Sequence, residues 1–147
     1  MKYILKLDQT AEESVTVIAH MPSALTEQIE NLVLAYRGED KISVWSEDEM
    51  IQLSFSEIEC IAVIDRKVIA IDKNNVRYRV PKRLFELESV LPSYFIRINK
   101  SALANENRIL RFKTVWNGGV DVIFKCGYQD YVSRRCFSEI KRRFQVK

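Results

Sequence analysis

The sequence predicts a mainly β fold, and three observations support this class. A chain of 147 residues with 47% hydrophobic residues is long enough for one well-packed domain. Short alternating or apolar runs follow one another between residues 42 and 132, at the length and spacing typical of strands. Turn-forming residues separate these runs, whereas only three segments show the spacing of an amphipathic helix.

The first 40 residues predict a small β-β-α unit. Alternating residues at Tyr3–Leu7 and Val15–Ala19 flank a polar stretch, a pattern typical of two strands joined by a turn. Apolar residues then recur at helical spacing over residues 23–36, before Gly38 ends the run. A unit of this size is too small to hold a core alone. We therefore expect it to pack on the rest of the chain or on a second copy, with a dimerisation or regulatory role.

Residues 41–147 predict nine short strands and two helices. The strands are expected at Ile42–Trp45, Met50–Phe55, Ile58–Ile64, Val68–Ile71, Val76–Val80, Tyr94–Ile98, Ile109–Phe112, Val120–Lys125 and Tyr128–Val132. Turns are expected at Asp72–Asn75, Asn117–Gly118 and Cys126–Gly127, where the residues tolerate a positive φ. The helices are expected at Pro81–Val90, with the proline in the first helical position, and at Ser133–Phe144, with the serine as N-cap.

The two halves of the chain differ in charge. Residues 1–60 hold 4 basic and 12 acidic side chains, a net charge of −8, whereas residues 61–147 hold 19 basic and 8 acidic ones, a net charge of +11. Such a basic stretch favours a polyanionic partner, either nucleic acid or an anionic membrane surface.

Residue counts exclude several kinds of chemistry. Cys60, Cys126 and Cys136 show no CxxC spacing and His20 is the single histidine, so a structural zinc site cannot be assembled. Glycine is too scarce for a GxxxxGK[ST] or GxGxxG loop, and the acidic run Glu47–Glu49 is typical of a solvated hairpin. We therefore expect no catalytic residue, cofactor or metal, and a reducing, cytoplasmic location without a membrane span.

Basic residues gather where predicted strands and helices meet turns. Arg66–Lys67 lies between two strands, Arg97–Ser101 follows a strand, and Arg134–Arg135 opens the last helix. Each cluster alone is typical of a solvated surface, but three together favour a surface for phosphates. Arg, Lys and Asn are also suited to base edges in a major groove. The aromatic residues lie at core-like spacings, which favours a duplex over single-stranded nucleic acid.

Residues 84–135 also carry an ordered set of motifs. These are LFELE at 84–88, LP at 91–92, FIRINKS at 95–101, Asn105, Ile109, Asn117–Gly118 and VSRR at 132–135. Over residues 42–146 the chain resembles the LytTR family of bacterial DNA-binding domains. This resemblance implies an elongated fold of about ten strands whose loops contact two successive major grooves. The first 40 residues look like the N-terminal extension of stand-alone LytTR regulators, too short for a receiver domain with a phosphoacceptor aspartate.

The resemblance also implies roles for individual residues. Carried over position by position, it implies base contacts by four exposed-type basic residues: Arg66, Lys67, Lys100 and Arg135. It implies phosphate contacts by the polar residues beside them: Arg97, Asn99, Ser101 and Arg134. The chain departs from the family pattern at Cys126–Gly127, where the family has a second Asn-Gly turn. It also departs at residues 102–104, which are smaller than usual and predict a looser core segment.

Together these observations predict a sequence-specific transcriptional regulator that binds double-stranded DNA as a homodimer on paired half-sites. A membrane protein encoded elsewhere is a candidate regulator, and no small-molecule substrate is expected. The alternative is a non-catalytic interaction module whose basic face docks an acidic protein or an anionic membrane surface. A nuclease is disfavoured because the chain has no histidine base or convergent carboxylates.

Overall fold

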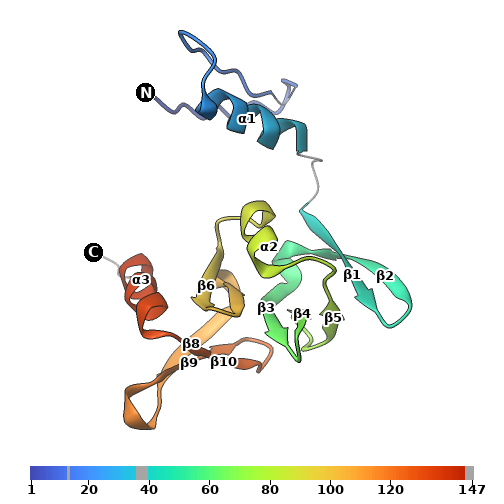
Figure 1. Ribbon diagram of the computed structural model, residues 1–147, viewed down its shortest axis with the longest axis vertical. Coiled ribbons are helices and arrows are strands. Elements are labelled where there is room, and N and C mark those ends of the chain that lie inside the picture. Colours follow the sequence, from blue (N-terminus) through green and yellow to red (C-terminus); the bar gives the residue numbers. More distant parts are fainter. Residues whose placement is uncertain (13, 36–39, 145–147) are drawn as a thin grey trace. The chain divides into compact units, whose positions relative to one another are not determined.

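The computed structural model describes residues 1–12, 14–35 and 40–144 of the chain (Figure 1). The chain divides into two compact units, Met1–Glu39 and Asp40–Lys147. Among the described residues, the second unit holds all ten strands and two of the three α-helices.

Two antiparallel β-sheets form the second unit. Seven strands build the large sheet, in the spatial order β2-β1-β5-β4-β3-β7-β6, and three build the small sheet, in the order β10-β9-β8. In chain order the strands are β1 (Lys41–Ser46), β2 (Glu49–Ser54), β3 (Ile58–Ile64), β4 (Lys67–Asp72), β5 (Arg77–Arg79), β6 (Phe95–Asn99), β7 (Ala102–Asn105), β8 (Ile109–Thr114), β9 (Val120–Phe124) and β10 (Gln129–Val132). The mainly β class is confirmed, and each predicted strand of this unit overlaps an observed one.

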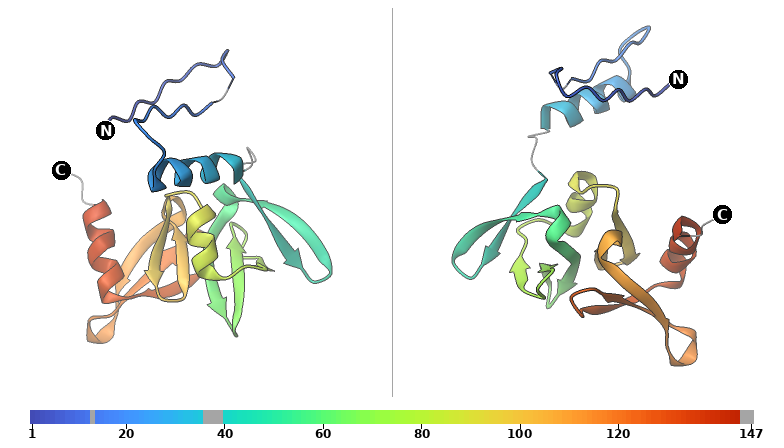
Figure 2. Two further views of the ribbon diagram at one scale, coloured as in Figure 1. Left: turned by 45° about the horizontal axis from the view of Figure 1, so that its top comes forward. Right: turned by 180° about the vertical axis from the view of Figure 1, so that it is seen from behind.

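The helices of the second unit, α2 (Leu84–Val90) and α3 (Arg134–Phe144), lie on either side of β6 (Figures 1 and 2). The predicted cap of α3 is confirmed, because the Ser133 hydroxyl accepts the N–H of Cys136 at 3.2 Å. The predicted start of α2 at Pro81 is wrong. Arg83 keeps an extended backbone, with φ −79° and ψ 153°, so the helix begins only at Leu84.

Each face of the large sheet buries its own hydrophobic cluster. Leu84 and Leu87 of α2 pack in one cluster with Ile61 of β3. The neighbouring Cys60 belongs to the other cluster, which includes residues of the small sheet and Ile140 of α3. Consecutive residues of β3 thus alternate between the two clusters, so the large sheet lies between α2 and the layer made by the small sheet and α3.

One strand of the large sheet, β7, is absent from the strands predicted by the sequence. Ala102, Leu103, Ala104 and Asn105 are all buried, and β7 pairs with β3 on one edge and β6 on the other. In place of the looser segment expected from the small residues, the chain forms a central strand. A strand buried on both faces shows no alternation, and alanine has a low β propensity, which explains why the pattern missed it.

A buried carboxylate joins the two sheets. Glu59 of β3 is fully buried and forms an ion pair with Arg108, directly before β8. It also accepts the N–H of Cys126, in the turn between β9 and β10, at 2.8 Å. Because both partners flank strands of the small sheet, Glu59 fixes that sheet against the large one.

The first unit contains one helix, α1 (Ala24–Ala35), within the predicted helical segment, while Tyr36 and Gly38 lie outside the described residues. Neither Tyr3–Leu7 nor Val15–Ala19 forms a strand, which differs from the predicted β-β-α arrangement. None of the described side chains of this unit is buried. Without an apolar face to bury, a pair of strands is only marginally stable in water. None of the helices in the described residues is long and apolar enough to cross a bilayer.

Candidate nucleic-acid interface

The first basic cluster, Arg66 and Lys67, lies at the tight turn between β3 and β4. Ile64 pairs with Lys67, so Asp65 and Arg66 form a two-residue tip. Both tip residues have a positive φ, 50° for Asp65 and 66° for Arg66, as type I′ turns require. Glycine is favoured at the second position, and a residue with a side chain costs about 1 kcal/mol there. Arg66 is therefore held exposed at a conformational cost, which is typical of a functional position.

The second cluster surrounds the turn between β6 and β7. Lys100 is exposed at this turn, and its carbonyl oxygen accepts a hydrogen bond from Arg97 Nη1 at 3.0 Å. Arg97 also forms an ion pair with Glu88 of α2. Asn99 Oδ1 accepts the N–H of the half-buried Ser101 at 2.8 Å. The side chains of Arg97 and Asn99 thus both bond the peptide group that joins Lys100 to Ser101.

The third cluster, Arg134 and Arg135, occupies the first turn of α3. Both side chains are exposed, and this turn contains no acidic residue. A helix N-terminus carries a partial positive charge, so each arginine is disfavoured there by about 0.3–1 kcal/mol until an anion approaches. The same positive end supplies free N–H donors. The start of α3 is therefore suited to a phosphate or to a base edge rich in acceptors.

Hydrogen bonds connect the β6–β7 turn with the other two clusters. Asn99 Nδ2 donates to the carbonyl oxygen of Tyr131, just before α3, at 2.8 Å. The N–H of Ser133 donates to a carbonyl oxygen of β6 at 2.9 Å. On the other side, the N–H of Val63, near the end of β3, donates to the carbonyl oxygen of Ser101 at 2.8 Å. The three clusters thus lie on directly bonded elements, although they are far apart in the sequence.

Asn99 does not have the exposure expected of a phosphate contact. Only 1% of its surface is exposed, and its amide also donates to Asp130 Oδ1 at 3.3 Å. Regular alternation along β6 would place Arg97 and Asn99 together on the face opposite Ile96 and Ile98. A register shift between these two residues breaks the alternation of β6 and turns Asn99 inward. Its side chain therefore supports the turn from inside the protein.

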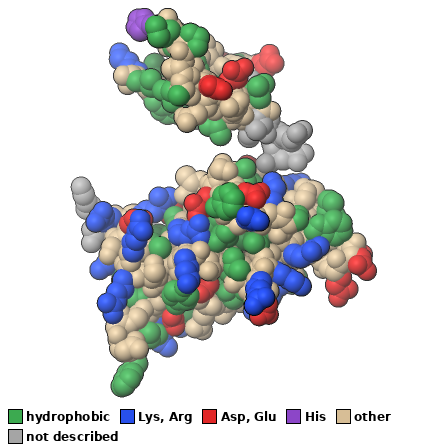
Figure 3. Space-filling model, in the orientation of Figure 1, with side chains coloured by type: hydrophobic (Ala, Val, Ile, Leu, Met, Phe, Trp, Pro, Cys, Tyr) green, Lys and Arg blue, Asp and Glu red, His purple; other side chains and the backbone are tan. Residues whose placement is uncertain are grey.

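The space-filling view shows how charge is distributed over one face of the second unit (Figure 3). Lys and Arg side chains are spread across this face with several acidic side chains among them, and a further acidic group lies at the end of the β1–β2 hairpin. That hairpin end carries Glu47, Asp48 and Glu49, which are all exposed. The basic residues that give residues 61–147 their positive charge thus include separate clusters at turns and at the start of a helix.

The cysteines are poor candidates for chemistry. Burial raises the pKa of the Cys60 thiol well above its ordinary value, and burial also raises the pKa of Cys126. Both thiols are therefore protonated and weakly nucleophilic at neutral pH. Among the described residues, no group of three His, Cys, Asp or Glu side chains is arranged to hold a metal ion.

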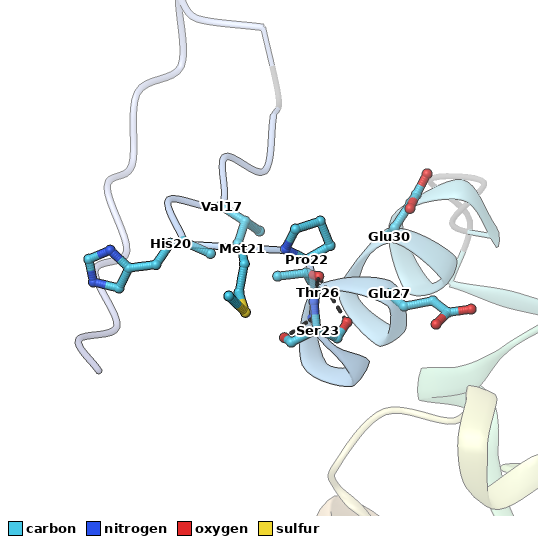
Figure 4. A pocket seen from close by; sticks show the side chains of 9 residues that line it. Val17, His20, Met21, Pro22, Ser23, Thr26, Glu27 and Glu30 are labelled. Atoms are coloured by element: carbon cyan, nitrogen blue, oxygen red, sulfur yellow. Dashed lines mark hydrogen bonds between the residues drawn. The ribbon is translucent and has the colours of Figure 1, made fainter.

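A hollow lies beside the start of α1 in the first unit (Figure 4). Its polar groups are used to cap the helix: the N–H of Ser23 donates to Thr26 Oγ1 at 2.8 Å, and the N–H of Thr26 donates to Ser23 Oγ at 3.3 Å. The exposed His20 points away from α1 (Figure 4). The hollow therefore does not gather chemical groups around a ligand.

One exposed residue of the second unit is not identified by the sequence patterns. Trp116, at the tip of the β8–β9 hairpin, has 92% of its surface exposed. The predicted turn at Asn117–Gly118 is confirmed, with φ values of 69° and 83°. A tryptophan is normally counted as a core residue, so only the structure reveals that this one faces solvent.

Comparison with known proteins gives the family. The family model of the LytTr DNA-binding domain matches residues 48–145. A solved LytTr DNA-binding domain from Bacillus cereus is similar over 74% of this chain and 100% of its own, with a TM-score of 0.67 and 21% identity, which shows a shared fold.

Relatives of the same length occur in Staphylococcus aureus. A protein of strain NCTC 8325, named an uncharacterized HTH-type transcriptional regulator, is 30% identical over 149 residues, which is 99% of each chain. A protein of the same name in strain MW2 is 28% identical over 145 residues, 97% of this chain and 98% of its own. The helices described in the present chain are separated by strands, so they form no helix–turn–helix. With its family match over residues 48–145, the chain belongs to the LytTR family of DNA-binding domains.

Proposed function

We propose that this chain is a cytoplasmic transcriptional regulator that binds specific sequences in duplex DNA through its three basic clusters. The observation that carries the proposal is the set of hydrogen bonds joining these clusters through Asn99, Ser101 and Ser133. Base contacts are best supplied by the exposed basic residues at the tips: Arg66, Lys67, Lys100 and Arg135. Phosphate contacts are best supplied by their polar neighbours: Arg97, Ser101 and Arg134.

Arg97 has two roles in this proposal, because it is held by Glu88 in the free protein and can contact a phosphate in the complex. Its guanidinium is partly exposed and donates to the Lys100 carbonyl oxygen. Binding to a phosphate would replace the carboxylate of Glu88 with another oxygen acceptor. Arg97 therefore positions Lys100 in the free protein and is close enough to the turn to meet the backbone of bound DNA.

The test begins with the selection of bound duplexes from a random pool. Recovery of a shared sequence motif supports the proposal, and affinity for that motif is then measured for Arg135→Ala. Loss of a bidentate base contact costs about 1–3 kcal/mol on the selected duplex and little on random DNA. Arg83→Ala is the matched control, because Arg83 is exposed at the start of α2 and its side chain makes no capping hydrogen bond.

Salt dependence gives a second, independent measurement. If about six phosphates are neutralised, the logarithm of affinity falls against the logarithm of salt concentration with a slope near −5. A pool without any enriched motif, combined with equal losses on all polyanions, would instead favour the interaction module that docks an acidic protein or membrane surface.

The homodimer is supported by the first unit. Its described side chains are all exposed or half-buried, including Leu32 and Leu34 of α1. Association of two copies would bury this surface and place two DNA-binding domains on paired half-sites. A membrane protein that acts as the regulator would compete for the same surface.

A further inference from the structure

The tip of the β8–β9 hairpin presents a large aromatic side chain to solvent. Trp116 is 92% exposed, more than any other large hydrophobic residue among those described in the second unit. By contrast, Phe112 of the same hairpin packs against Phe137 and Phe144 of α3. The hairpin is therefore anchored at its base, while no described element of the second unit covers its tip.

The turn that carries Trp116 is well defined by hydrogen bonds. The N–H of Val115 donates to the carbonyl oxygen of Gly119 at 2.9 Å, and the N–H of Gly118 donates back to the Val115 carbonyl oxygen at 3.2 Å. A Cβ at position 119 would meet Val115 Cγ2 at 3.0 Å, so this turn is closely packed. A side chain on such a turn loses little backbone entropy when it binds.

The charges around the tip favour an anionic partner. Arg111 and Lys113 are exposed on β8, whereas Asp121, which pairs with Lys113, is half-buried. Exposed cations beside an exposed aromatic residue form the combination that recognises nucleic acid, because phosphates meet the cations and sugars or bases meet the ring. An acidic protein surface would satisfy the cations but would leave the indole without a partner.

The position of the β8–β9 tip favours the DNA duplex of the proposed function as the anionic partner of Trp116. β8 pairs with β9 and β9 with β10, and β10 leads directly to Arg134 and Arg135. The β8–β9 tip and the β3–β4 turn both lie at the lower edge of the second unit in the views of Figures 1 and 2. A duplex lying against the three basic clusters would therefore continue past α3 toward this tip.

We propose that Trp116 docks into the minor groove of the same duplex, beside the base pairs that face Arg135. This inference rests on the proposed DNA-binding function and adds a contact outside the three basic clusters. The indole has one N–H donor and no acceptor, which suits the acceptor-only edges of A·T pairs in the minor groove and the phosphate oxygens. Its apolar ring can pack on sugars, as the apolar wedges of minor-groove proteins do.

The fluorescence of Trp116 provides the test. The chain contains two tryptophans, and Trp45→Phe leaves Trp116 as the single reporter. Two duplexes carry the motif recovered by selection: one extends well beyond it on both sides, and the other ends at its last base pair. Acrylamide quenching of Trp116 is measured for the free protein and for each complex. We expect quenching to fall only with the longer duplex.

Affinity gives the complementary measurement. Trp116→Ala is expected to weaken binding to the longer duplex roughly tenfold, the range of one aromatic contact with nucleic acid, and to leave the shorter duplex unaffected. Phe85→Ala is the control, since Phe85 is an exposed aromatic residue on α2. Tight complexes in which Trp116 stays equally accessible on both duplexes would overturn the inference but leave the proposed function intact. Failure of the wild-type chain to bind any duplex would overturn the proposed function itself.

Discussion

Asn99 donates a hydrogen bond to the backbone carbonyl oxygen of Tyr131 at 2.8 Å, although the two residues are 32 positions apart in the chain. The same side chain accepts the N–H of Ser101, so one buried amide bonds both the β6–β7 turn and the strand that leads into α3. The positions of Lys100 and Arg135 are therefore coupled through a residue that is itself out of reach of solvent.

Removal of this amide is expected to damage stability and binding together. Asn99→Ala leaves the Ser101 N–H and the Tyr131 carbonyl oxygen without their partner, at a cost of about 1–3 kcal/mol in the free energy of unfolding. Chemical denaturation measures this loss. In a double-mutant cycle of Asn99→Ala with Lys100→Ala, the effects on DNA affinity should be strongly non-additive. Simple additivity would show that Asn99 does not position Lys100.

Substitution of the strained tip residue is expected to separate stability from function. Arg66→Gly relieves the positive φ of 66° and should raise the free energy of unfolding by about 0.5–1 kcal/mol, while removing a proposed base contact weakens DNA binding. Arg66→Ala keeps the strain but removes the same guanidinium. Equally weakened DNA binding in the two variants, with higher stability for the glycine variant alone, would support both assignments, and wild-type affinity in both would exclude Arg66 from the interface.

Two ion pairs of the second unit should differ greatly in their contribution to stability. Glu59→Gln breaks the ion pair between the fully buried Glu59 and the partly exposed Arg108 and weakens the contact between the sheets, so we expect a loss of about 2–4 kcal/mol. Glu57→Gln breaks the exposed pair between Glu57 and Lys73, whose atoms are 3.3 Å apart, and should cost less than about 1 kcal/mol. Thermal or denaturant unfolding compares the two variants. A similar loss of stability in both would argue against the role of Glu59 in joining the two sheets.

The carboxyl group of Asp130 should give stability a particular dependence on pH. Burial raises the pKa of Asp130 above its ordinary value of 3.8, despite hydrogen bonds that lower it. The folded state therefore binds more protons than the unfolded state just above pH 3.8, and this carboxyl group destabilises the fold as pH rises through its folded pKa. Asp130→Asn keeps an acceptor oxygen for the N–H of Tyr131 but cannot titrate.

The wild type and Asp130→Asn are best compared by denaturation across the acidic range. The variant should gain stability relative to the wild type as pH rises from below 3.8 toward neutrality. The difference between the two proteins cancels the titration of all other carboxylates. A relative loss of stability for the variant over this interval would mean that hydrogen bonds, rather than burial, dominate at Asp130.

The proposed dimer is testable at α1. Leu32 is 65% exposed, and Leu32→Glu places a charge on the surface that a second copy would cover. Sedimentation is expected to show dimers of the wild type and monomers of the variant at the same concentration. Leu110→Glu introduces the same charge at an exposed leucine of β8 and serves as the control. If the wild type itself sediments as a monomer bound singly to DNA, the dimer is excluded.

Most strands of the second unit could be predicted from the sequence because turns separate them clearly. Asn117 and Gly118 show how strong such local signals are, since both adopt the positive φ that their residue types favour. β7 is absent from the predicted strands because Ala102 and Ala104 have low β propensity. They form a strand because β3 and β6 pair with them on both sides. The expected strands near Tyr3 failed for the opposite reason, since their alternation has no buried face to stabilise it.

The candidate interface was only partly predictable. Residue type identified Arg66, Lys100 and Arg135, whose exposure at turns and helix ends agrees with their chemistry. The inward position of Asn99 depends on the irregular pairing of β6 with β7, which alternation cannot reveal. Trp116 depends on the absence of any covering element at a hairpin tip, a property of the folded chain rather than of the residue.

The pairing of β3 with β7 has a consequence for how related regulators acquire different targets. β3 leads into the Arg66 turn and β7 leaves the Lys100 turn, and main-chain hydrogen bonds join these two neighbouring strands. Strands in such a ladder are about 4.8 Å apart whatever their side chains. If the two tips contact bases as proposed, exchange of a tip residue would change which bases are preferred, while the separation of the two tips would stay the same.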